Sequence, residues 1–89
     1  MAATVQAQSL KDSSLVRSLN QFAKANYAKP ATQNEAFTKA KEALALSEKI
    51  KFKLGELDAL IILEGIYSIQ GKHSEAQTPF SALISLLKT

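Results

Sequence analysis

The stretch from Gly55 to Gly71 constrains the fold of this chain more than any other. Its apolar residues recur every three or four positions, the spacing that places side chains on one face of an α-helix. They form two sets, Leu60, Leu63 and Tyr67 on one face and Ile62, Ile66 and Ile69 on another. A helix with two apolar faces is buried by neighbours on both sides, so this segment is predicted to be the central helix of a helical domain.

Gly71 is predicted to end the central helix. A glycine directly after the last periodic residue commonly closes a helix in the left-handed conformation. Lys72 would then open a tight turn into the next helix. We therefore expect the chain to reverse here and to form a helical hairpin.

Two helices are predicted before the central one. The first is placed at about 14–28, and Pro30 stops it because the residue before a proline is pushed out of helical geometry. The second is placed at about 33–50. Thr32 and Glu35 have the spacing of a capping box at its start, in which the threonine side chain accepts a backbone bond and the glutamate reaches back.

The start of the last helix is left open between two registers. The run from Ser74 to Gln77 has the form of a second capping box, which would start the helix at Glu75 and place Pro79 in its second turn. In the alternative, Thr78 caps a helix whose first residue is Pro79. Either register predicts a break or irregularity near Thr78.

Residues 1–12 show no helical period and few large apolar side chains. They are predicted to be a disordered N-terminal segment, followed by the helical domain at 13–89. Within the segment, Val5-Gln6-Ala7 resembles the small-residue end of a secretory signal whose charged and apolar parts are missing. An extracytoplasmic location is one interpretation, and an ordinary frayed terminus of a cytoplasmic protein is the other, so the compartment stays open.

Composition argues against several classes of function. The net charge of +3, from 11 basic and 8 acidic residues, is mild, and the lysines are scattered without the basic stripe that nucleic-acid binding requires. No apolar run approaches the roughly 20 residues that span a bilayer, so no membrane insertion by this segment is expected. The absence of cysteine excludes disulfides and thiolate metal sites.

No catalytic, cofactor or metal site is predicted. His73 is the only histidine, whereas a zinc site needs several nitrogen or sulfur ligands. Glu56 and Asp58 begin the central helix, where negative charge complements the helix dipole, and we prefer that role to a paired acid–base site. The three glycines are too widely spaced to cradle phosphate. The chain is therefore predicted not to be an enzyme.

The two halves of the chain resemble each other at an offset of 40 residues. The offset relates Tyr27 to Tyr67, Ala36 to Ala76 and Leu44 to Ile84, among others. A shared period of this kind is typical of helix–turn–helix units stacked side by side. The predicted fold is all-α, with four helices in two stacked antiparallel hairpins at about 14–51 and 55–88.

The second hairpin carries a family resemblance. The residues concerned are Leu44 to Ile50, Gly55, Asp58-Ala59-Leu60, Ile66 to Gly71 and Glu75-Ala76. This pattern resembles the tetratricopeptide repeat (TPR), in the wider-period form found in bacterial sensor histidine kinases and repeat-bearing transcriptional regulators. The resemblance implies a protein-interaction module within a larger bacterial signalling protein. Glu64 departs from the pattern, which usually has a small residue there, so it is expected to pair with a lysine or tilt to solvent.

TPR folds usually bind on the concave surface made by the first helix of each hairpin. By that resemblance the groove is lined by Ser18, Gln21, Ala25, Ala28, Asp58, Ile61, Gly65, Ser68 and Ile69. The Lys and Asn clamp that holds acidic chaperone peptides is absent, because Gln21, Ala25 and Ile62 occupy its places. Ile61 favours an apolar helix or extended segment of a protein or peptide partner. Alternatively, Ile61 meets another helix of the same protein.

The last helix offers more apolar surface than one hairpin can cover, at Leu83, Ile84, Leu86 and Leu87. A solenoid needs a polar outer face on its last repeat, and this helix lacks one. We therefore expect further repeats or a homo-oligomer that associates through these residues. This feature also supports a second class of function, a structural or oligomerising helical domain with no groove ligand.

Overall fold

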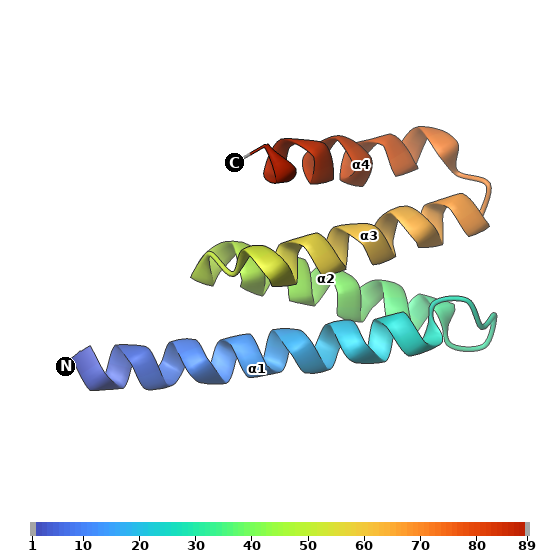
Figure 1. The fold of residues 1–89 in the computed structure, drawn as a ribbon. Coiled ribbons are helices and arrows are strands. Elements are labelled where there is room, and N and C mark those ends of the chain that lie inside the picture. Colours follow the sequence, from blue (N-terminus) through green and yellow to red (C-terminus); the bar gives the residue numbers. More distant parts are fainter. Residues whose placement is uncertain (1, 89) are drawn as a thin grey trace.

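The computed structural model of the chain consists of helices joined by short turns (Figure 1). It describes residues 2–88, with side chains from Leu10 to Lys88, and this range contains four α-helices and no strand. The helices are α1 (Ala2–Asn26), α2 (Gln33–Ile50), α3 (Lys53–Ile69) and α4 (His73–Leu87). The predicted all-α class and the number of helices are confirmed.

Consecutive helices run antiparallel and pack against each other, as the hairpin prediction requires (Figure 1). α3 also contacts α1, whereas α4 contacts only α3 among the helices described. α3 therefore touches all three other helices. This confirms its predicted place at the centre of the domain.

α1 begins well before the predicted start at residue 14. The prediction of a disordered segment at 1–12 therefore differs from the structure, which has helix from Ala2 onward; Met1 lies outside the described residues. The segment contains no glycine or proline and is rich in alanine and glutamine, which favour helix without tertiary contacts. Leu10 is largely exposed. An apolar period therefore indicates which face of a helix is buried, and its absence does not exclude helix.

The core lies between α1, α2 and α3, where small side chains on α2 let the other two helices approach. The buried stripe on α2 consists of Ala36, Ala40, Ala43 and Ser47. Its alanines contribute to two apolar clusters that follow one another along the helix, one built from Val16, Leu19, Ala43 and Ala59, the other from Ala23, Ala36, Ala40, Ile62, Leu63 and Ile66. Small residues at a helix contact shorten the distance between axes, which explains why one helix can hold two neighbours closely.

The closest approach is at Gly55, in the first turns of α3. A methyl group added there would lie 2.6 Å from Val16 Cγ1 and 2.9 Å from the ring of Phe52, and would also collide with Ser47 Oγ. Only glycine fits this space. The buried Asn20 side chain donates from Nδ2 to the Gly55 carbonyl oxygen at 3.1 Å, which ties α1 to α3 at the same point.

α2 and α3 end in the same way, each followed by a residue in the left-handed conformation. Gly71 has a positive φ of 73°, and the Lys72 amide donates to the Tyr67 carbonyl oxygen at 2.8 Å, as expected for a left-handed helix end. The predicted role of Gly71 is confirmed. Lys51, at the end of α2, has a φ of 58°, and the Phe52 amide donates to the Ser47 carbonyl oxygen at 2.8 Å. This turn places the Phe52 ring beside Gly55.

α4 begins at His73, so neither predicted register is right. The helix runs through Pro79 without the break expected near Thr78. Pro79 is buried, and burial of its ring against α3 compensates for the backbone bond it cannot make. Neither predicted capping box forms. Thr32 Oγ1 donates instead to the Asn26 carbonyl oxygen, which fastens the turn between α1 and α2.

The 40-residue offset is partly visible in the pattern of burial. Ala36 and Ala76 are both buried, whereas Ala40 is buried and Phe80, its counterpart, is 52% exposed. The difference arises because α3 covers α2, and no described helix covers the corresponding side of α4.

The two tyrosines that the offset relates share half-burial but not their neighbours. Tyr27 lies against Gly65 of α3, whereas Tyr67 packs edge-on against the Phe37 ring of α2 with centroids 5.6 Å apart. The offset is therefore kept at the buried pair Ala36 and Ala76, but not in the surroundings of the two tyrosine rings.

Replacement of Gly55 by alanine is expected to lower the free energy of unfolding by roughly 1–3 kcal/mol, because the methyl overpacks a closed contact. Gly65→Ala is the control. Its methyl meets only the half-buried Tyr27 ring, at 3.2 Å, and gains helix propensity of up to about 1 kcal/mol. Urea unfolding followed by circular dichroism measures both. A Gly55→Ala variant as stable as the parent would contradict the described junction.

Ser47→Ala tests the same junction from α2. The Ser47 hydroxyl is fully buried and has no hydrogen-bond partner among the described residues. Its removal is expected to leave stability unchanged or raise it by about 1 kcal/mol, since an unpaired buried polar group is costly. In the Gly55→Ala background, Ser47→Ala should recover part of the lost stability. The interaction free energy between the two substitutions should exceed about 0.5 kcal/mol in a double-mutant cycle. Purely additive effects would show that the two residues do not touch.

Candidate protein-interaction grooves

Two grooves open on opposite faces of α3. One is lined by Asp58, Ile61 and Ile62, and the other by Glu56, Leu60, Leu63 and Tyr67. At 100° per residue these two sets lie about half a turn apart around the helix. We name them the α1–α3 groove and the α2–α4 groove after the helices that wall them.

The α1–α3 groove has a volume of about 320 Å³. Its lining residues come from the first helix of each hairpin: Arg17, Asn20, Gln21, Lys24, Tyr27, Asp58, Ile61 and Ile62. Ile61 is 54% exposed and is the largest exposed apolar side chain among them. The lining also includes Arg17 and Lys24 from α1 and Asp58 from α3, so the groove combines an exposed apolar side chain with charges of both signs.

Three of the nine predicted groove residues line this groove together, Gln21, Asp58 and Ile61. Gly65 lies beside it, under the Tyr27 ring. The other five are exposed but outside the groove: Ser18, Ala25, Ala28, Ser68 and Ile69. Ser68 instead donates to Glu64 Oε1 at 3.0 Å, so the carboxylate that departs from the repeat pattern is met within its own helix rather than by a lysine.

Asn20 is a lining residue that the sequence analysis did not predict, and it links α1 to α3. It is 5% exposed, donates to the Gly55 carbonyl oxygen, and its Oδ1 has no partner among the described residues. The sequence does contain a signal for it, a polar residue directly after Leu19 within the apolar stripe of the first helix. A buried amide is costly unless it is bonded, which makes Asn20 a residue that positions α3 against α1.

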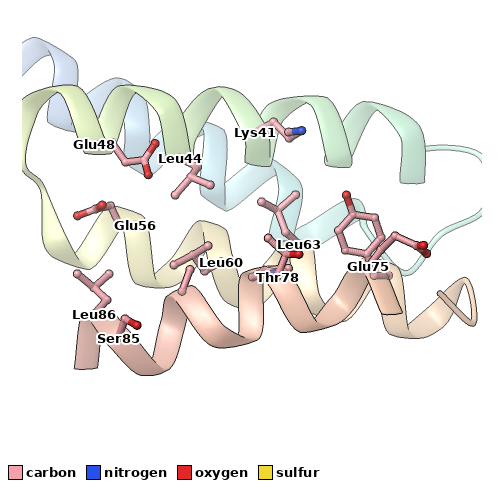
Figure 2. Close-up of a pocket in the computed structure, with 13 residues that line it drawn as sticks. Lys41, Leu44, Glu48, Glu56, Leu60, Leu63, Glu75, Thr78, Ser85 and Leu86 are labelled. Atoms are coloured by element: carbon pink, nitrogen blue, oxygen red, sulfur yellow. The ribbon is translucent and has the colours of Figure 1, made fainter. Parts of the chain in front are cut away.

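The α2–α4 groove is larger, with a volume of about 670 Å³ (Figure 2). It exists because α4 packs on α3 alone and does not contact α2 along the described chain. Its lining is mostly apolar and consists of Leu44, Leu60, Leu63, Tyr67, Pro79, Ala82 and Leu86, with Lys41, Glu48, Glu56, Glu75, Thr78 and Ser85 among them. The sequence analysis did not predict this groove, because its width depends on how far apart α2 and α4 lie.

Acidic residues outnumber basic ones in the lining of the α2–α4 groove. Three of the charged residues are glutamates, Glu48, Glu56 and Glu75, and one is Lys41. Lys41 Nζ lies 5.5 Å from the centroid of the Phe37 ring, a cation–π distance that holds this charge over the aromatic face. Three glutamates and one lysine give the lining a formal charge of −2, on a chain whose net charge is +3.

The predicted association residues of α4 are split between two faces. Leu86 is half-buried and lines the α2–α4 groove, and Leu83 is half-buried as well. Ile84 and Leu87 are exposed, and Phe80, which the prediction omitted, is exposed with them. The open apolar face of α4 is thus made of Phe80, Ile84 and Leu87.

The remaining chemistry of the described chain is sparse. No group of three or more His, Cys, Asp or Glu side chains that could hold a metal ion is present among the residues described. The only histidine, His73, is exposed at the start of α4. None of the described helices combines the length and hydrophobicity needed to cross a bilayer.

We compared the chain with protein-family models, with curated proteins and with solved structures, and none of the three comparisons produced a match.

Proposed function

We propose that this chain is a non-catalytic protein-interaction module of the TPR type, and that it holds a segment of a partner protein in the α1–α3 groove. The observation that carries the proposal is the position of this groove, between the first helices of two consecutive hairpins, with the exposed Ile61 in its lining. By the resemblance given above, the module is part of a larger bacterial signalling protein such as a sensor histidine kinase.

The arrangement of the helices supports this function. Consecutive antiparallel hairpins whose first helices touch each other form the kind of surface on which helical repeats bind proteins. The buried pairs Ala36 and Ala76, and Ala23 and Leu63, keep the 40-residue offset. These features are independent of the residues that line the groove.

The chemistry of the groove favours a segment with an apolar side chain next to polar ones. Ile61 offers an exposed apolar contact, and burial of a matching side chain is worth about 25 cal/mol per Å² of apolar surface. Arg17 and Lys24 on one wall and Asp58 on the other can pair with charges of either sign. Such charges at the edge of an apolar contact set the orientation of a partner more than its affinity.

A second function, a structural or oligomerising domain, is favoured by one observation. Phe80, Ile84 and Leu87 are 52%, 38% and 63% exposed on one face of α4. Exposed apolar side chains gathered on one face commonly mark a protein contact. In that case association would depend on α4 and not on the α1–α3 groove.

Ile61→Lys is expected to weaken partner binding by roughly tenfold or more, because a charge replaces the central apolar contact. Ala45→Lys, on an exposed position of α2 outside both grooves, is the matched control. Proteins retained by the immobilised parent and by the control, but not by Ile61→Lys, would be groove partners. Circular dichroism checks that all three proteins are equally helical.

Ile84→Lys separates the two functions. If light scattering after size exclusion shows self-association that Ile84→Lys abolishes, and Ile61→Lys changes neither association nor partner capture, the α1–α3 proposal is wrong and the structural function is favoured. If Ile61→Lys alone removes the partner, the interaction module is supported.

A further inference from the structure

The α2–α4 groove has no role in the proposed function, because it lies on the other face of α3. Its floor is formed by Leu60 and Leu63, with Leu44 on the α2 side and Pro79 and Leu86 on the α4 side. Figure 2 shows Leu44 and Leu60 lying between the two walls. A volume of about 670 Å³ is within the range of sites that bury a ligand, and most of its lining is apolar.

The walls of the groove favour a helical occupant. Both walls are α-helices, whose backbone groups are already bonded internally, so the groove offers no sheet edge to an extended strand. An extended segment would leave its own amides and carbonyls unpaired over an apolar floor, at a cost for each group. A helix brings its backbone bonds with it and packs between two other helices by the ordinary fit of ridges into grooves.

The length of the groove matches about three turns of helix. Its lining runs from Glu56 to Tyr67 along α3 and from Glu75 to Leu86 along α4, with eleven residue steps between the two ends in each case. At a rise of 1.5 Å per residue these spans are about 16 Å. A helix of three turns presents apolar anchors at spacings of three and four residues, which is how amphipathic helices fill such grooves.

The charge of the groove selects among amphipathic helices. Glu48 and Glu56 lie at one end, on α2 and α3, and Glu75 lies toward the other end (Figure 2). None of the three makes an ion pair within residues 10–88. Because the lining carries three glutamates and one lysine, an occupant meets carboxylates at both ends of an apolar floor and a net negative charge. Basic residues beside the apolar face would complement them.

We propose that the α2–α4 groove binds an amphipathic helix of a partner protein, with its lysine or arginine residues at Glu48, Glu56 and Glu75. The apolar face of that helix lies over the floor of Leu60 and Leu63 and against the half-buried side chains of Leu44 and Leu86. This inference is independent of the proposed function, because it uses the opposite face of α3. It gives the module a second surface, so that two partners can be held at once.

The test uses three synthetic 15-residue peptides carrying a fluorophore. The first has leucines at helical spacings of three and four and lysines on the flanks. The second has glutamates in place of the lysines, and the third has serines in place of the leucines. Fluorescence anisotropy with the whole chain is expected to show saturable binding of the first peptide, at least tenfold weaker binding of the other two, and a loss of affinity as salt rises.

Two variants locate the binding. Ala82 lines the groove and is exposed, so Ala82→Arg should block the groove and lower the affinity for the first peptide by tenfold or more. Ser81→Arg, at the neighbouring exposed position of α4 outside the groove, should change affinity by less than about twofold. The double change Glu48→Gln and Glu56→Gln should weaken binding severalfold and reduce its dependence on salt.

Each outcome of these measurements either supports or overturns the proposal. Binding that responds to Ala82→Arg and to the glutamate changes, but not to Ile61→Lys, supports the proposal whether or not the α1–α3 groove has a partner. No saturable binding of the first peptide up to roughly 1 mM would overturn it. So would equal affinity for the glutamate peptide, indifference to Ala82→Arg, or loss of binding on Ile61→Lys alone, which would place the peptide in the other groove.

Discussion

The close approach of α3 to α1 and α2 at Gly55 is the contact on which the rest of the structure depends. Without a side chain at this position, α3 reaches Val16 of α1, Ser47 of α2 and the Phe52 ring of the turn that precedes it. The buried bond from Asn20 to the Gly55 carbonyl oxygen fixes the same point. A larger residue would push α3 outward and separate the three helices that share the core. The small stripe on α2 then continues this close packing along the helix.

Because α3 is held at the centre, its two remaining faces become the two sites of interest. One looks between the first helices of the hairpins, where Ile61 is exposed. The other looks between α2 and α4, which do not touch in the described chain. The grooves differ in character: the first has two basic residues and one acidic residue in its lining, and the second is mostly apolar with three glutamates and one lysine. A single helix therefore supplies residues to two surfaces suited to different partners.

The sequence predicts those parts of the fold that depend on local chemistry or on spacing within one helix. The bounds of α2 and the closure at Gly71 are confirmed, because each follows from neighbours a few residues away. The start of α1 and the register of α4 were missed, since helix propensity and the burial of Pro79 outweigh the pattern of caps. Only three of nine predicted groove residues line one groove, and the α2–α4 groove was not predicted at all. Both depend on distances between helices, which a one-dimensional period does not contain.

The central claim is that α3 lies against α1 and α2 at Gly55, and a nuclear Overhauser experiment on isotope-labelled protein measures it directly. The structure predicts strong cross-peaks from the Gly55 α-protons to a Val16 methyl group and to the ring protons of Phe52. It also predicts one side-chain amide of Asn20 that is protected from exchange with solvent. A well-dispersed helical spectrum in which the Gly55 cross-peaks are absent would contradict this account.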